Sequence, residues 1–169
     1  MPDVLIGLGS NLADRKTLID EAITRLGLLP KTRVVARSSY YRTEPVGPVE
    51  QEWFINAAVR LITESDAEAL ATACREIEAA LGRDRSVEVP SGPRFIDIDV
   101  IAARGEEAKA EDYDLRHARF IEHAFALVPL AEIVPNARLD GRTVAEHLSD
   151  IDQSGVERLD WPVPEIPAP

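Results

Sequence analysis

Residues 92–100 read Gly92-Pro93-Arg94-Phe95-Ile96-Asp97-Ile98-Asp99-Val100. Apolar and acidic residues alternate here as they do in a β-strand, where successive side chains point to opposite faces of the sheet. Ile96, Ile98 and Val100 therefore share one face, and Asp97 and Asp99 emerge together on the other. Aspartate is disfavoured in strands, and neighbouring carboxylates repel each other unless a cation bridges them. The stretch predicts a divalent-metal platform on a strand, with a solvated acidic edge as the alternative.

The paired carboxylates indicate which metal and which ligand to expect. Two hard oxygen donors with few others nearby suit Mg²⁺, which keeps water ligands and completes its shell with a substrate's phosphates. The preceding loop, residues 83–93, holds Arg83 and Arg85, and Arg94 follows it directly. Three arginines beside paired carboxylates favour a phosphate site over arginines that merely solvate a loop. Nucleotide chemistry is therefore the leading hypothesis.

The composition limits the class of protein. A chain of 169 residues, 45% of them hydrophobic, can bury one core, so we expect one domain over residues 1–151 and a proline-rich tail over residues 152–169. The net charge of -11 argues against nucleic acid or an acidic membrane as a partner. There is no apolar stretch of membrane-spanning length, no signal-peptide pattern, and Cys74 is the only cysteine. We expect a soluble, cytoplasmic monomer.

Hydrophobic periodicity predicts the order of the elements. The first helix has Asp14 as its N-cap and Gly27 as its stop, and the second begins at a capping box over residues 65–68 and buries Cys74. We expect strands over residues 3–8, 32–41, 54–62 and 97–103, and helices over residues 14–27 and 65–82. The order βαββαβ predicts an α+β fold of ferredoxin-like type, an antiparallel sheet with helices packed on it.

The last third of the chain gives weaker patterns. Residues 106–116 predict a charged loop with a short strand, and residues 143–148 predict a turn or two of helix. Residues 124–133 predict a short helix that is interrupted at Pro129 or starts there. The prolines after residue 151 exclude a helix, so the tail is either a strap or disordered.

Motifs along most of the chain resemble those of the 6-hydroxymethyl-7,8-dihydropterin pyrophosphokinase family. In order and spacing they cover the chain from about residue 3 to residue 135 and are Gly9-Ser10-Asn11-Leu12, Tyr41-Arg42-Thr43-Glu44-Pro45-Val46-Gly47, Phe54-Ile55-Asn56-Ala57, Ile77-Glu78 leading to Gly82-Arg83, and residues 92–99. The resemblance implies a three-layer α/β/α arrangement with helices on both faces of the sheet. It also implies two Mg²⁺ ions and transfer of diphosphate from ATP to the pterin's hydroxymethyl group, with release of AMP.

The resemblance also assigns roles to residues. It implies that Asp97 and Asp99 hold both metal ions and act in catalysis together with Arg83 and Arg94. The residues implied to bind the nucleotide are Glu78, Arg85, Ile98, His117 and His123. The pterin would lie between Phe54 and Phe125, with its polar edge read by Asn56 and by the backbone around Thr43, Pro45 and Val46. For the two phenylalanines ordinary core packing is the alternative, and for Glu78 a solvated helix position.

The chain departs from the family pattern at three points. Ser91 stands where the family commonly has Trp, Arg116-His117-Ala118 replaces Pro-His-Pro or Pro-His-Tyr, and His123 replaces an arginine. Two other functions stay open. A nucleotidyltransferase also combines Gly-Ser with Asp-x-Asp, but there the two lie a short helix apart, whereas Ser10 is far from Asp97 in this chain. The second alternative is a pterin- or nucleotide-binding regulatory module without turnover.

Overall fold

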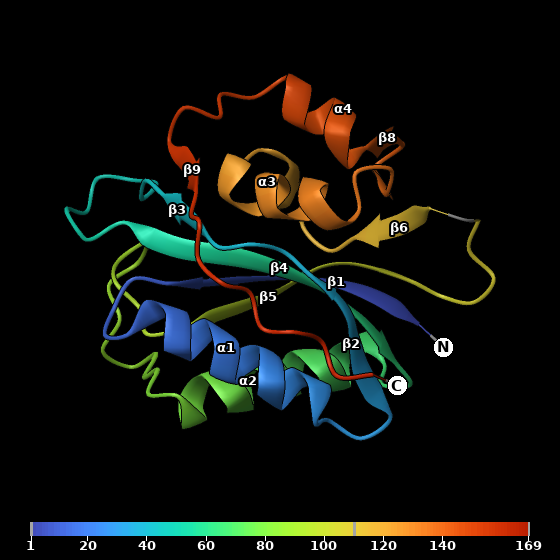
Figure 1. Ribbon diagram of the computed structural model, residues 1–169, viewed down its shortest axis with the longest axis horizontal. Coiled ribbons are helices and arrows are strands. Elements are labelled where there is room, and N and C mark those ends of the chain that lie inside the picture. The colour runs from blue at the N-terminus through green and yellow to red at the C-terminus, as the bar shows by residue number, and fades with distance from the viewer. Residues whose placement is uncertain (1, 110, 169) are drawn as a thin grey trace.

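A nine-stranded sheet forms the centre of the protein (Figure 1). The computed structural model describes residues 2–109 and 111–168. Strand β1 (Asp3–Ser10) lies between β4 (Phe54–Thr63) and β5 (Asp97–Arg104) and is antiparallel to both. The other strands are β2 (Thr32–Arg37), β3 (Tyr41–Thr43), β6 (Asp112–Leu115), β7 (Arg138–Leu139), β8 (Arg142–Thr143) and β9 (Val156–Arg158).

Helices cover both faces of this sheet. Figure 1 shows α1 (Arg15–Gly27) and α2 (Ala67–Ala80) on one face, and α3 (Ala124–Ile133) and α4 (Val144–Ser149) on the other. A 3₁₀ helix, η1 (Ala118–Ile121), precedes α3. Neighbouring residues of β1 enter opposite cores, because Ile6 packs with the α1 and α2 cluster and Leu5 with the α3 cluster. Both side chains are fully buried, and the α+β class is as expected.

Several local predictions are confirmed. Asp14 caps α1 by accepting a hydrogen bond from the Thr17 N–H at 3.1 Å, and the helix ends at Gly27. Cys74 is buried in the core, and the short strand expected within residues 106–116 is β6. Of the described residues, no helix is long and apolar enough to cross a membrane.

The strand expected over residues 32–41 is divided in two, which corrects the prediction. β2 ends at Arg37 and β3 begins at Tyr41, and both pair with β4. The break lies at Ser38 and Ser39. The Ser38 hydroxyl accepts the Ala58 N–H at 2.9 Å, and the Ser39 N–H donates to the Glu132 carboxylate of α3. The Ser38 N–H still donates to the Ala58 carbonyl at 2.9 Å, but side chains take the return bond and the Ser39 N–H, so the regular ladder is interrupted here.

Three further predictions were wrong in detail. The N-cap of α2 is Asp66, one residue after the expected start, because its carboxylate reaches the Ala69 N–H at 2.8 Å. Pro129 lies inside α3, where it removes one backbone bond while its neighbours Leu127 and Leu130 stay buried against the sheet. The sheet is not wholly antiparallel, since β6 and β7 pair in parallel.

The C-terminal segment crosses the sheet edge as a strap, one of the two predicted alternatives. We call residues 152–161 the strap. Its strand β9 pairs with β3, and beyond it Leu159 and Trp161 pack against the core. The Trp161 ring lies 5.5 Å from that of Tyr40, between ring centroids. The strap therefore forms the outer edge of the sheet beside β3.

We expect Cys74 to resist thiol reagents in the folded protein. Burial raises the pKa of its thiol to about 12, so little thiolate exists at pH 8, and the side chain is enclosed by the core. Reaction with 5,5′-dithiobis(2-nitrobenzoate) at pH 8 should be about a hundredfold slower than in the guanidinium-unfolded chain. Immediate reaction of the native protein would contradict the burial.

Candidate functional site

A cavity of ≈ 330 Å³ opens where the ends of β1, β4 and β5 meet the segments after β3 and around the start of α3. One side of this cavity is charged and the other carries aromatic and amide groups. The charged side brings together all five residues predicted from the carboxylate strand and its loop, namely Arg83, Arg85, Arg94, Asp97 and Asp99. The opposite side contains Thr43, Pro45, Val46, Phe54, Asn56, His123 and Phe125, which were also predicted.

The paired carboxylates project over glycine residues of the neighbouring strand. In the β1–β5 pair, Gly9 lies opposite Asp97 and Gly7 lies opposite Asp99. Directly opposed residues point to the same face, so two glycines leave the space beside the carboxylates open. A Cβ on Gly9 would lie 2.8 Å from Nδ2 of Asn56, which is too close. The glycine motif near the N-terminus therefore shapes the floor of the cavity.

Arg83 is the most enclosed cation of the site, with a side chain that is 3% exposed. It donates to Glu88 at 2.6 Å and to Asp97 at 2.8 Å, and it also bonds to Glu78. Burial alone would lower its pKa, but these three carboxylates hold the pKa of Arg83 above its usual value. Arg94 bonds to the other oxygen of Asp97 at 3.3 Å. Asp97 is thus held between two arginines.

Glu78 lies behind the cavity and does not border it. Its carboxylate, at the end of α2, accepts the Ile98 N–H and an Arg85 N–H, both at 2.9 Å, besides its bond to Arg83. The Ile98 side chain points into the core and is also away from the cavity. The solvated alternative for Glu78 is wrong, because the side chain is 2% exposed. Nucleotide contacts by Glu78 and Ile98 stay predictions.

Asp99 has fewer partners than Asp97. Its only ion pair in the described part of the chain is with Arg119, at 3.7 Å. Burial, together with the nearby charge of Asp97, raises the pKa of the Asp99 carboxyl to about 7. Arg119 was missed by the sequence analysis, although it stands two residues after His117 in a segment that had been noted. It borders the cavity from η1, opposite the other arginines.

The charges of the site balance before any ligand is added. Four arginines are paired with the four carboxylates of Glu78, Glu88, Asp97 and Asp99. A polyphosphate would therefore need added cations to be held here. Within residues 2–109 and 111–168 no group of three or more His, Cys, Asp or Glu side chains could hold a metal ion. Two carboxylates alone suit a metal that takes its remaining ligands from water and from the phosphates themselves, as Mg²⁺ does.

On the opposite side, the amide of Asn56 has a fixed orientation. Its Oδ1 accepts from the Thr43 hydroxyl at 2.5 Å, and its Nδ2 donates to the Leu8 carbonyl at 3.2 Å. Asn56 is buried, whereas the Phe54 and Phe125 rings are only partly covered. An oriented amide between two accessible aromatic rings suits a flat heterocycle with a polar edge.

The two histidines have different surroundings. The His123 ring is stacked on Phe125, with centroids 5.1 Å apart and planes inclined by 16°. His117 does not border the cavity, and its Nδ1 accepts the Arg119 N–H at 3.1 Å at the start of η1. His117 thus orients the turn that carries Arg119. A direct contact of His117 with nucleotide stays a prediction.

Asn11 joins the two long loops beside the cavity and was not predicted as a site residue. Its Nδ2 donates to Gln51 Oε1 and to the Glu52 carbonyl, both at 2.9 Å, and its Oδ1 accepts the Arg94 N–H at 2.9 Å. Gln51 in turn donates to the Ser91 carbonyl at 2.7 Å. One amide side chain therefore sets the distance between the loop after β3 and the loop before β5.

Fold and site together define an α+β protein with a cavity that is lined by charged groups on one side and by aromatic and amide groups on the other. Residues 5–135 match the 7,8-dihydro-6-hydroxymethylpterin-pyrophosphokinase (HPPK) family. The chain belongs to this family. It is similar to the 2-amino-4-hydroxy-6-hydroxymethyldihydropteridine pyrophosphokinase of Methylorubrum extorquens, with 47% identity over 160 residues, 95% of this chain and 100% of the relative.

More distant relatives carry the same name. The Pseudomonas aeruginosa protein is 36% identical over 157 residues, 92% of this chain and 96% of the relative. The Bacillus subtilis protein is 36% identical over 151 residues, 89% of this chain and 86% of the relative. A crystal structure of an HPPK-DHPS protein in complex with substrates matches with a TM-score of 0.68 and 11% identity, covering 94% of this chain and 48% of that one. The chain thus spans about half of the solved protein, and this likeness supports the fold alone.

The two carboxylates should respond differently to neutralisation in metal-free protein. Asp97→Asn removes the partner of Arg83 and Arg94 and should lower stability by about 1–2 kcal/mol. Asp99→Asn removes a partly buried charge that Asp97 repels, and should leave the melting temperature unchanged or higher. Because the folded-state pKa of Asp99 is raised to about 7, wild-type stability falls as pH rises from about 4 to 7, and the advantage of the Asp99→Asn variant should grow over that range.

Thermal melts in chelator at pH 5 and pH 8 measure this contrast. Equal losses for both variants would show that Asp99 is as well paired as Asp97.

Proposed function

We propose that this protein transfers diphosphate from ATP to the hydroxymethyl group of 6-hydroxymethyl-7,8-dihydropterin in folate biosynthesis and releases AMP. The observation that carries the proposal is the division of one cavity into a charged side and an aromatic–amide side. ATP and the pterin would meet at that division. Membership in the HPPK family and the names of its relatives support the same reaction.

The charged side would hold the phosphates. Asp97 and Asp99 would hold two Mg²⁺ ions, which neutralise charge on the phosphates when bound. Arg85 and Arg94 border the cavity, are partly exposed and donate from the loop side. Buried Arg83 would act mainly by fixing Asp97, because all three of its nitrogens already donate to protein groups. Glu78 would align Arg83 and Arg85 from behind the cavity.

The aromatic side would hold the pterin. Phe54 and Phe125 would stack on the ring, and Asn56 with the backbone of Thr43, Pro45 and Val46 would read its polar edge. His123 extends the aromatic surface of Phe125. In such a pose the hydroxymethyl oxygen would face the charged side, where the β-phosphorus would be held. Catalysis then consists of alignment and charge stabilisation, because phosphoryl transfer needs little covalent help from the protein.

We also propose the finer description of the fold and of the protein's setting. The order β1-α1-β2/β3-β4-α2-β5 supports a ferredoxin-like core, and helices on both faces of the sheet support a three-layer arrangement. Residues 1–151 would form the catalytic domain. The strap is a separate segment that packs onto it. A monomer in the cytoplasm, free of nucleic acid and membrane, is the setting that suits a folate-pathway enzyme with a net charge of -11.

Both alternatives make distinct predictions about products. A nucleotidyltransferase would release diphosphate and keep AMP on its product, and a regulatory module would bind ligands without releasing AMP. The separation of Ser10 from Asp97 along the chain disfavours the nucleotidyltransferase. No specific observation favours the regulatory module.

The decisive assay is conversion of ATP to AMP that depends on both 6-hydroxymethyl-7,8-dihydropterin and Mg²⁺. Asp99→Asn should lower kcat by about a thousandfold or more with the fold intact, because its carboxylate is a metal ligand. Arg142→Ala, which alters an exposed arginine outside the cavity, should leave the rate unchanged. AMP release without pterin, or normal turnover by the Asp99→Asn variant, would contradict the proposal.

Arg119 should contribute to nucleotide binding. It has one long ion pair and is 56% exposed, so its N–H groups are the least engaged of the four cavity arginines. Arg119→Ala should weaken binding of a Mg-ATP analogue about tenfold, as expected for loss of one charge-assisted hydrogen bond, with pterin binding changed little. Arg116→Ala is the matched control, because Arg116 is a nearby exposed arginine that does not border the cavity. Equal affinities for both variants would exclude Arg119 as a ligand contact.

A further inference from the structure

The wall of the cavity on the aromatic side depends on a very short strand. β3 spans only Tyr41–Thr43 and leads directly into residues 43–46, which border the cavity. Its inner edge pairs with β4 and its outer edge with β9 of the strap. Two backbone bonds flank the outer ladder, from the Leu159 N–H to the Tyr40 carbonyl and from the Glu44 N–H to the Gly155 carbonyl, both 2.9 Å. The strap thus supplies half of the strand's pairing.

The bond from Glu44 is the last backbone support before the loop. For the described residues 45–53, no backbone–backbone hydrogen bond is present. Gly155 also touches this position closely, since a Cβ there would lie 3.3 Å from Glu44 Cβ. A segment with no backbone hydrogen bonds of its own is held in place by the segments it contacts. The position of residues 44–46 is therefore set by the strap on one side and by Thr43 on the other.

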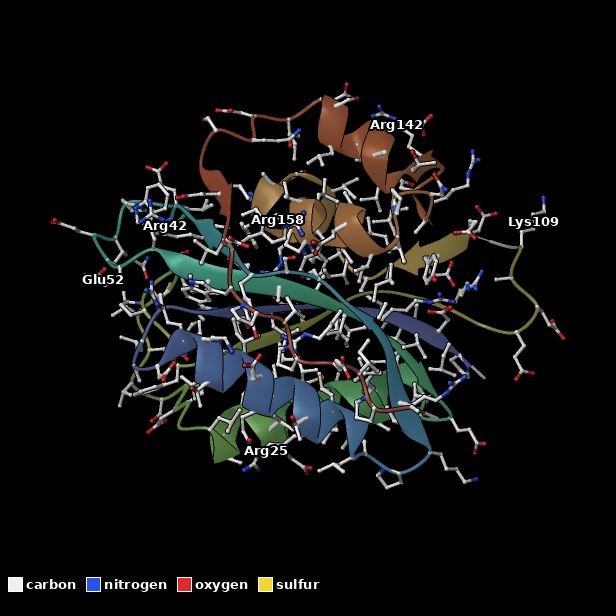
Figure 2. All side chains as sticks on the ribbon, in the orientation of Figure 1. Arg25, Arg42, Glu52, Lys109, Arg142 and Arg158 are labelled. Atoms are coloured by element: carbon white, nitrogen blue, oxygen red, sulfur yellow. The ribbon has the colours of Figure 1, made fainter. Side chains whose placement is uncertain are left out.

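Side chains fasten the strap to the helix on the same side of the cavity. Arg158 of β9 pairs with Glu132 of α3 at 3.1 Å and donates to the Ser39 hydroxyl at 3.0 Å. Ser39 donates to the same carboxylate, from its hydroxyl at 2.7 Å and from its N–H. Figure 2 shows Arg158 between the strap and α3. Because α3 also carries Phe125, one cluster ties together both elements that form this wall.

We infer that the strap positions the ring-binding wall of the cavity through the β3–β9 ladder, with Arg158, whose side chain is 65% exposed, as the positioning residue that links the ladder to Glu132 and Ser39. The inference rests on the proposed function. Among the described residues, those of the strap contact neither the β5 carboxylates nor the arginines around them. Loosening the strap should therefore disturb the pterin and spare the nucleotide. An effect on pterin binding without an effect on nucleotide binding would distinguish a positioning role of the strap from general support of the fold.

The test compares Arg158→Ala, Arg158→Lys and the control Arg142→Ala. Arg142 is likewise an arginine in an ion pair, with Asp150 at 2.7 Å, and Figure 2 shows it on the far side of α4 from the strap. Hydrogen exchange of residues 41–46 should become about tenfold faster in Arg158→Ala, be largely restored in Arg158→Lys, and stay unchanged in the control. The KM for pterin should rise about three- to tenfold, and the KM for Mg-ATP less than about twofold.

Two results would overturn the inference. One is unchanged exchange of residues 41–46 in Arg158→Ala, and the other is an equal rise of both KM values. Thermal melts identify a variant that is unfolded, and Trp161→Ala then provides a second way to loosen the strap at its Tyr40 contact. If the wild-type protein releases no AMP with pterin, the proposed function fails, but the exchange experiment still decides whether the strap holds β3.

Discussion

The buried ion pair between Glu78 and Arg83 is the interaction on which the charged half of the site depends. Both side chains are almost fully enclosed, at 2% and 3% exposure. Burying two charges is costly unless every polar atom finds a partner. Here the remaining capacity of the carboxylate is used by the Ile98 N–H and by Arg85, and that of the guanidinium by Glu88 and Asp97.

This network fixes three separate parts of the chain with respect to one another. Glu78 lies in the last turn of α2, Arg83 begins the long loop, and Ile98 lies between the two carboxylates of β5. A change of Glu78 or Arg83 leaves the other buried charge without its partner, which is more damaging than loss of a surface pair. A buried network of charges adds little to the free energy of folding, because desolvation offsets its attraction, but it fixes the positions of the Asp97 and Arg83 side chains. The charged side is therefore rigid before a ligand arrives.

The aromatic side is built on a different principle. Its rings come from β4 and α3, and its backbone wall comes from a loop that has one oriented amide, Asn56, and the strap as neighbours. Exposed pairs such as Arg42 with Glu157, at 3.1 Å, add little to this support. The β3–β9 ladder and the Ser39–Glu132 bonds provide most of it, and the exposed Arg158 links the two. If the phosphates and the ring bind as proposed, the rigid half would hold the phosphates and the adjustable half would let the ring enter.

Much of this structure was predictable, because it depends on local patterns. A few consecutive residues were enough to predict the helix cap at Asp14, the burial of Cys74, and the strand that carries Asp97 and Asp99. The resemblance to the family brought together the residues on both sides of the cavity. What the sequence did not predict depends on partners far apart along the chain. Ser39 and Glu132, which divide the expected strand, are 93 residues apart, and Asn11 meets Arg94 across 83 residues.

The charge balance of the site explains how an acidic protein can bind a polyphosphate. Its cations are concentrated at one cavity, yet each is paired with a carboxylate, so the arginines alone present no excess positive charge. Nucleotide without a divalent ion would meet Asp97 and Asp99 directly and be repelled. With a divalent ion on Asp97 and Asp99, as we propose, the same carboxylates would attract the phosphates and the arginines could turn toward them. On that proposal metal and nucleotide would bind together, and the same two carboxylates would keep free polyanions out.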